Sequence, residues 1–430
     1  MPCKSLHSYP ACRWLLQLNA ISTSETQQDE SKSAEDSDNT FSKMVAQKPS
    51  SRIRDWGYSP GRFPTGRRNS VLDVPGVRVG QVDINKGEDV HTGVTVIFPR
   101  GIDKTTYIPC YGAVHDMNGI GEWTGVHQLR EWGFSRAPIA FTNTVSVGKV
   151  YDTLWRWTAQ RLRQDGIADL LDQVQYYGFP TVGETFDGLL NNIFKSAVEE
   201  EHVLAAIKSA ETQEAVLEGN HGGGTAMRSH GFKAGTGTSS RVLKGDGDIE
   251  YTVGVIVQNN YGSMDDLQID GVPVGRMLKA RKMAMAAPTA PESGKAAEGT
   301  QRAGMGLSQV SGHGVGRNFS GEFFMALSTA NTPESPSSWD GVSSSLPPLL
   351  ETDTVETMKS MLIDSVFVAA AEATEEALLN SMTEAETMKG FNGFEAKALP
   401  RKEVEELLRK HGRGYVRDLV PESYTSQIGL

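Results

Sequence analysis

The chain has 430 residues, a net charge of −11, 38% hydrophobic residues and 22% charged residues. These values are ordinary for a globular protein of one large or two medium domains, and the negative charge argues against nucleic acid and anionic membrane surfaces as partners. No apolar run approaches the roughly 20 residues that a membrane-spanning helix needs. Cys3, Cys12 and Cys110 show no metal-ligand spacing and cannot all pair, so we expect a reducing, cytoplasmic location.

The first fifty residues differ in composition from the rest of the chain. Residues 1–24 are basic and lack acids, and a stretch rich in Ser, Glu and Asp follows. We expect residues 1–50 to form a disordered or targeting tail, with a mitochondrial location if residues 1–24 act as a transit peptide. A true start at Met44 is an alternative. Residues 51–430 are predicted to form a single domain.

Strand and helix patterns alternate from Arg54 onward. Short apolar runs predict strands at 76–84, 93–99 and 138–144. Amphipathic patterns predict helices at 146–166, 186–210, 355–382 and 401–410. Residues 287–300 form a linker by composition, and residues 333–350 form a surface loop by their Ser and Pro content. Mixed strands and long helices predict an α/β fold with helices packed outside stacked sheets.

The glycine-rich runs do not match a phosphate-binding loop. GNHGGGTAM (219–227) and GTGTSS (235–240) lack the Walker lysine and the strand–GxGxxG–helix context. Tight turns are the favoured interpretation. In the first run, the backbone N–H groups of Gly222 and Gly223 are candidates for binding a substrate carboxylate. The nine histidines form no HExxH motif or His/Cys cluster, and no GxSxG motif occurs, so we predict neither a metal nor a cofactor.

Polar residues stand at the ends of two apolar runs. Asn260 is the last amide of VQNN, directly after the run YTVGVIVQ. Ser320 and Glu322 are two residues apart and open the run FFMALS. Side chains at strand ends are held rigidly and can converge on one cleft. Glu184, within VGETFDGLLN, is a candidate for binding a substrate ammonium group.

Nine collinear runs over most of residues 54–408 resemble the self-processing serine aminopeptidases, the family of the L-aminopeptidase/D-Ala-esterase and the β-peptidyl aminopeptidases. Together they are far more specific than any single motif. The runs are SVLDVPGVRVGQV, TGVTVIFPRG, NGIGEWTGVHQLREWG, PIAFTNTVSVG, PTVGETFDGLLN, GGGTAM with FKAGTGTSSR, VQNNYG, QIDGVPVG and SGEFFMALSTANT.

The resemblance implies an αββα sandwich and a precursor that cuts itself before a serine. That serine becomes an N-terminal nucleophile, and its α-amine, with a pKa near 8, is a competent base. Asn260 matches the family's oxyanion asparagine, and Ser320 and Glu322 match its hydroxyl–carboxylate pair. Tyr151 matches a tyrosine near the oxyanion, although a helix tyrosine that only packs its ring is the alternative. Short peptides and amino-acid amides or esters are the implied substrates, and we expect a homo-oligomer.

The chain departs from the family at the nucleophile. Family members carry a segment of the form DGSIIVVVATDAPL, followed by a helix that ends like RAGLGLSQVGG. Here the linker APTAPESGKAAEGT (287–300) runs directly into QRAGMGLSQVSGHG. A central strand of about seven residues is therefore lacking, which would leave backbone groups on both neighbouring strands unpaired.

Three explanations compete, in this order. The coding sequence skips a short exon of an ordinary active enzyme, or the chain is a catalytically dead binding or scaffold protein, or Thr300 supplies a threonine nucleophile. The third would resemble the N-terminal-threonine acyl transferases such as ornithine acetyltransferase. We expect the chain as written to lack self-cleavage and hydrolysis.

Overall fold

The computed structural model describes residues 51–167, 176, 178–247, 249–283, 301–317, 320–334, 351–359 and 362–412. Three predicted segments therefore lie outside the described residues. They are the tail 1–50, the linker 287–300 and residues 335–350 of the surface loop.

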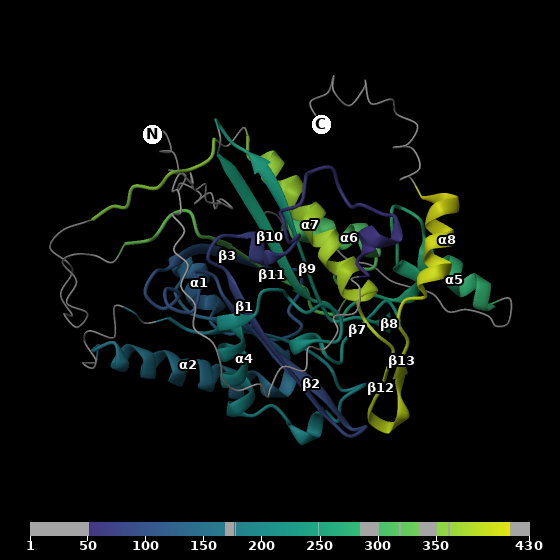
Figure 1. The fold of residues 1–430 in the computed structure, drawn as a ribbon, viewed down its shortest axis with the longest axis horizontal. Coiled ribbons are helices and arrows are strands. Elements are labelled where there is room, and N and C mark those ends of the chain that lie inside the picture. The colour runs from purple at the N-terminus through teal and green to yellow at the C-terminus, as the bar shows by residue number, and fades with distance from the viewer. Residues whose placement is uncertain are drawn as a thin grey trace, which may run out of the picture.

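The elements alternate between strands and helices along the chain (Figure 1). The strands are β1 (Arg78–Lys86), β2 (Val90–Phe98), β3 (Cys110–Asp116), β4 (Phe134–Ser135), β5 (Ile139–Asn143), β6 (Thr181–Thr185), β7 (Arg228–Ser229), β8 (Phe232–Lys233), β9 (Thr236–Lys244), β10 (Glu250–Gln258), β11 (Phe323–Ser328), β12 (Met388–Lys389) and β13 (Glu395–Ala396). The α-helices are α1 (Val126–Trp132), α2 (Val147–Gln164), α4 (Glu200–Thr212), α5 (Val274–Met283), α6 (Gln301–Ser311), α7 (Asp364–Thr383) and α8 (Arg401–His411). The 3₁₀ turns are η1 (Ile53–Trp56), η2 (Val71–Asp73), η3 (Thr144–Ser146), η4 (Ile193–Lys195), η5 (Gly222–Gly224), η6 (Met264–Asp266) and η7 (Phe391–Gly393).

One sheet has the strand order β1-β2-β5-β6, and helices α2 and α4 cover its outer face. Strands β1 and β2 pair antiparallel, whereas β5 and β6 pair parallel. A core of apolar side chains such as Phe98, Leu154 and Val203 fills the space between this sheet and its helices. Gly80 permits the close approach of α4, because a Cβ atom at this position would lie 1.9 Å from the carbonyl oxygen of Ala206.

The second β layer consists of the pair β9–β10 and the sheet β11-β3-β4. Strands β9 and β10 pair antiparallel over nine residues, from Thr236↔Gln258 to Lys244↔Glu250. Helix α7 lies along this pair, and α6 packs on α7 (Figure 1). Between the two β layers, Ile97 and Ile139 of the first sheet pack against Ile256 and Met325 of the second. The order of layers is therefore helix, sheet, sheet, helix, as predicted.

Two predicted helices have different bounds in the structure. The segment 186–199 is not α-helical, because the buried Asp187 carboxylate accepts hydrogen bonds from the side-chain amides of Asn143 and Asn191 and holds the chain against β5. The helix predicted from residue 355 begins at Asp364. The backbone of Glu356 instead exchanges two hydrogen bonds with the Asn331 side chain. The strands predicted at 76–84, 93–99 and 138–144 and the helices predicted at 146–166 and 401–410 are confirmed, within two residues at most ends.

Candidate active site

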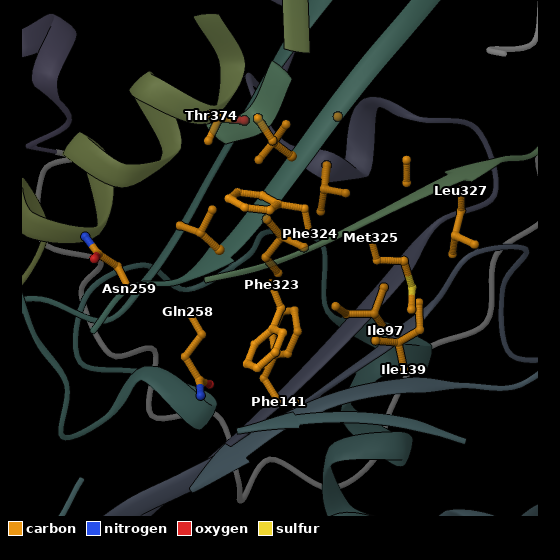
Figure 2. A pocket seen from close by; sticks show the side chains of 18 of the residues that line it. Ile97, Ile139, Phe141, Gln258, Asn259, Phe323, Phe324, Met325, Leu327 and Thr374 are labelled. Carbon is orange, nitrogen blue, oxygen red and sulfur yellow. The ribbon is translucent and has the colours of Figure 1, made fainter. Parts of the chain in front are cut away.

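A cavity of about 330 Å³ lies between β10 and β11. Its two sides are the consecutive residues Val253–Tyr261 and Gly321–Leu327. Ile97, Ile139 and Phe141 of the first sheet close it on one face, and α6 and α7 contribute residues such as Leu307, Thr374 and Leu378 to the other (Figure 2). The cavity is therefore an elongated, mostly apolar space inside the sandwich.

β10 turns an unpaired edge toward this cavity. It pairs with β9 only, among the strands that the structure describes. The backbone N–H of Thr238 donates to Glu218 and its carbonyl accepts from Asn380, so Thr238 does not exchange hydrogen bonds with its partner Ile256. In an antiparallel pair such positions alternate, and their backbone groups point away from the neighbouring strand. Ile256 and Gly254 thus direct their N–H and C=O groups away from β9.

β11 is open in the same way. Its described partner is β3, and the carbonyl of Glu322 accepts a hydrogen bond from the backbone N–H of Met117 at 3.0 Å. Hydrogen-bonded pairs with β3 therefore recur at every second residue of β11, counted from Glu322. The residues between them, Phe323, Met325 and Leu327, direct their backbone groups away from β3. Each long wall of the cavity is therefore a strand whose edge on the cavity side pairs with no other strand in the described ranges.

Ser320 and Glu322 form a hydrogen-bonded pair at the start of β11. The Ser320 hydroxyl donates to Glu322 Oε1 at 3.2 Å. Asn118 Nδ2 donates to the Ser320 carbonyl at 2.6 Å and lies 3.4 Å from Glu322 Oε2. Glu322 is only 6% exposed, and burial raises the pKa of its carboxyl to about 7, against the opposing hydrogen bonds from Gly316 and Ser320. This group can exchange a proton at neutral pH.

Asn260 follows β10 at the same end of the cavity. Its Oδ1 accepts from the Arg228 backbone N–H at 3.1 Å, and its Nδ2 donates to the Phe186 carbonyl at 3.0 Å. An amide nitrogen carries two hydrogens, so one donor is left for a ligand. The adjacent Asn259 is 2% exposed and lines the cavity, and its Oδ1 has no partner among the described residues (Figure 2).

Glu184, near the end of β6, is the second carboxylate that lines the cavity. It accepts hydrogen bonds from the Glu122 backbone N–H at 3.2 Å and from the Thr144 hydroxyl. A Cβ atom built on Gly121 would lie 3.0 Å from Glu184 Oε1 and 2.6 Å from the Phe323 ring, which places Glu184 beside the start of β11. Glu184, Asn260 and Glu322 therefore share one end of the cavity.

Other candidates are not brought to this cavity. Tyr151 lies on α2, half-buried against the core beneath the first sheet, and does not line the cavity. The N–H groups of Gly222 and Gly223 donate to Asp83 and Thr95, so they have no hydrogen left for a substrate carboxylate, and the tight-turn interpretation holds for this loop. Thr300 lies outside the described residues.

Sequence reasoning missed three residues of the site. Asn118 and Trp123 lie in the run NGIGEWTG, which was noted only as part of a resemblance. Asn118 anchors the pair at the start of β11, and the Trp123 ring packs edge-on against Phe323 with 5.9 Å between ring centroids. Asn259, whose Oδ1 has no partner among the described residues, was not predicted as a site residue, because only its neighbour Asn260 matched a known motif.

No ion-binding or membrane-spanning feature accompanies the cavity. Within the described ranges, no group of three or more His, Cys, Asp or Glu side chains is placed to hold a metal ion. None of the helices in the part of the chain that the structure describes is long and apolar enough to cross a membrane.

A two-sheet sandwich between helices is the layer order of the Ntn hydrolase fold, and here an amide, a hydroxyl and carboxyl groups lie at its strand ends. Residues 69–396 match Peptidase family S58. The chain is 36% identical over 397 residues to the beta-peptidyl aminopeptidase BapA of Sphingosinicella microcystinivorans, covering 84% of this chain and 93% of that protein. The chain therefore belongs to peptidase family S58, a family of serine aminopeptidases.

Solved structures agree with this assignment. The PH0078 protein of Pyrococcus horikoshii OT3 is 32% identical, with a TM-score of 0.71, and the match covers 84% of this chain and 99% of that one. The L-aminopeptidase D-Ala-esterase/amidase of Ochrobactrum anthropi, a prototype serine aminopeptidase with a variant Ntn hydrolase fold, matches with the same identity and coverage and a TM-score of 0.70. The predicted αββα sandwich and the predicted family are confirmed.

Proposed function

We propose that this chain carries the substrate site of an aminopeptidase that releases N-terminal residues from short peptides, amides or esters, and that the chain as written does not hydrolyse them. The observation that supports the site is the convergence of Asn260, Glu322 and Glu184 on one end of a single cavity. The relatives are a beta-peptidyl aminopeptidase and an L-aminopeptidase D-Ala-esterase/amidase, which supports peptides, amides and esters as the substrate class.

Each polar group has a role that its surroundings favour. The free N–H of Asn260 can donate to an oxyanion, and such a donor contributes about 10²–10³-fold to turnover. Glu322, with the Ser320 hydroxyl, can orient the amine of an N-terminal nucleophile and exchange a proton with it near neutral pH. Glu184 can hold the ammonium group of the substrate.

The proposed lack of activity rests on the nucleophile. Three threonines line the cavity in the described part of the chain, namely Thr185, Thr329 and Thr374. All three are internal residues without a free α-amine to act as their base. The family's Gly-Ser step and the strand after it are missing from the sequence. The binding groups are therefore present without the group that attacks the substrate.

A restored chain tests this proposal directly. It carries the family segment DGSIIVVVATDAPL inserted before Gln301. We expect the restored chain to split before the inserted serine and to hydrolyse amino-acid p-nitroanilides, whereas the original chain stays intact and inactive by mass spectrometry and absorbance. The matched control replaces the inserted serine with alanine and should neither split nor hydrolyse.

Two results would contradict the proposal. Hydrolysis by the purified original chain would mean that another nucleophile operates, and a cut before Thr300 would identify it. A restored chain that folds, as judged by circular dichroism and a cooperative melt, but neither splits nor hydrolyses would mean that the cavity is not the catalytic site.

A further inference from the structure

We propose that the cavity between β10 and β11, here called the β10–β11 slot, binds an extended apolar peptide as an inserted strand. The peptide is about seven residues long, has a free N-terminal amine and comes from another molecule. The inference rests on the proposed function for the position of the amine end, but it requires no hydrolytic activity. Its grounds are the backbone edges, the lining and the charges of the slot.

The length of the slot sets the length of its ligand. Its walls are nine consecutive residues on the β10 side, Val253–Tyr261, and seven on the β11 side, Gly321–Leu327. A strand rises about 3.3 Å per residue, so the shorter wall spans roughly 23 Å. A peptide of about seven extended residues matches that wall.

Backbone chemistry selects an extended peptide rather than a helix or an acyl chain. Ile256 on one wall and Phe323 and Met325 on the other direct their N–H and C=O groups away from their paired strands. Open strand edges are templates for adding a strand, and buried backbone groups need hydrogen-bond partners. An inserted strand can pair with both edges, whereas a helix satisfies its own backbone groups and an acyl chain has none.

The side-chain lining specifies an apolar peptide. One face of the slot is formed by Ile97, Ile139 and Phe141 (Figure 2). Helices α6 and α7 contribute apolar residues such as Leu307 and Leu378 to the lining on the other side. Alternate residues of a strand point to opposite faces. Because both faces are apolar, the ligand must be apolar at every central position, as strands buried on both faces are.

Charge fixes the direction of the peptide. Glu184 and Glu322 lie at the end of the slot where β11 begins, and Asn259 Oδ1 adds a buried acceptor without a partner among the described residues. These groups attract a free N-terminal ammonium. Arg302, the lining cation in the described ranges, stacks over the Phe367 ring at 4.7 Å. The peptide therefore runs parallel to β11 and antiparallel to β10.

The test uses the original chain and a synthetic peptide, Ala-Val-Ile-Val-Val-Ile-Ala, with a soluble Gly-Lys-Lys tail and a fluorophore at its C-terminal end. We expect saturable binding by fluorescence anisotropy. N-acetylation should weaken binding at least tenfold, and lysine at the central position should abolish it. Equal affinity of the acetylated peptide would overturn the assigned amine end, and the absence of saturable binding would overturn the site.

A protein variant separates strand insertion from simple apolar contact. Met325→Pro removes one N–H from the slot edge of β11 and leaves the bonds to β3 in place, so it should weaken binding at least tenfold. The matched control is Met325→Ala, which removes the same side chain from the lining but keeps the N–H, so Met325→Pro should bind clearly more weakly than Met325→Ala. Normal binding by a folded Met325→Pro protein would overturn strand insertion.

Hydrogen exchange gives a second readout that needs no variant. Bound peptide should slow amide exchange in the segments 250–258 and 323–328, because their free N–H groups become bonded. Unchanged exchange at saturating peptide would overturn the inference. The two proposals can also fail separately. An active restored chain beside an original chain that binds no peptide would overturn the strand slot alone, and peptide binding beside an inactive restored chain would overturn the proposed function alone.

Discussion

The substitution Glu322→Gln should change how the stability of the protein depends on pH. In the folded chain burial raises the pKa of this carboxyl to about 7, from 4.5 when it is exposed. Unfolding therefore releases a proton between these two values, and the free energy of unfolding falls as pH rises through this window. At about 1.4 kcal/mol per pH unit, the loss attributable to Glu322 by pH 8 is about 3 kcal/mol.

Glutamine is neutral at every pH, so the variant lacks this loss. Its amide cannot accept from both Asn118 and Ser320 as the carboxylate does, which adds an offset that does not depend on pH, so the comparison must use the slope rather than the absolute stability. Urea denaturation followed by tryptophan fluorescence from pH 5 to pH 8 measures that slope. We expect the stability of the variant relative to the natural chain to rise by about 2.5 kcal/mol over this range, because part of the total loss has already occurred by pH 5.

Two features make the measurement specific. Glu218 and Glu375 also have pKa values raised to about 7 by burial, but both are present in the natural chain and the variant, so their contribution cancels. Ser320→Ala should act in the opposite sense to Glu322→Gln, since removing a hydrogen bond to the charged form raises the pKa of Glu322 further. Parallel stability curves for the natural chain and Glu322→Gln would show that Glu322 is already ionised at pH 5 and would refute the reasoning.

Three further predictions concern the site and the core. In the restored chain, Asn260→Ala should lower kcat about 10²–10³-fold, and unchanged turnover would remove Asn260 from the oxyanion site. Arg241→Met should cost about 3–5 kcal/mol by urea denaturation, because it leaves the buried carboxylates of Glu372 and Glu376 without their shared partner. Gly306→Ala should lower the melting temperature, because its Cβ would lie 2.3 Å from the Ala371 carbonyl, whereas the matched Gly304→Ala, whose Cβ would lie at an ordinary contact distance of 3.7 Å from Met117 and Phe324, should be neutral or slightly stabilising. Equal effects of the two alanines would show that α6 does not pack on α7 as described.

Regular elements could be predicted where the hydrophobic pattern and the fold agree. β1 follows from a period-two pattern and α2 from a helical pattern, whereas β2 is buried along its whole length and follows from a short apolar run. The segment 186–199 has a helical pattern too, but the buried hydrogen bonds of Asp187 decide its conformation, and a pattern of apolar residues does not register such bonds. β3 was missed because its sequence, CYGAVHD, contains no continuous apolar run, and its partner β11 lies about 200 residues further along the chain.

The site could be predicted only in part. Asn260 and Glu322 could be predicted because they stand next to the ends of apolar strands, where a side chain is held rigidly by the strand beside it. The partners that hold these two residues, Asn118 and the backbone of Phe186, come from distant loops and become evident only in three dimensions. The N–H groups of Gly222 and Gly223 are not free for a substrate carboxylate, because they already donate to side chains of β1 and β2. The sequence of a glycine-rich run does not show which acceptors its N–H groups bond to.

The anchoring of the site residues explains how a binding site can persist without its nucleophile strand. Asn260 is held by the backbones of Arg228 and Phe186, and Glu322 by Asn118 and Ser320, none of which belongs to a strand inside the slot. The two walls are also held independently, β10 by nine pairs with β9 and β11 by six pairs with β3. These contacts hold the polar groups and the walls from outside the slot, and only the wall edges that face the slot lack a strand partner among the described residues. This arrangement supports the proposal that an unprocessed chain recognises peptides without hydrolysing them, and it requires the two properties to be physically separable in this fold.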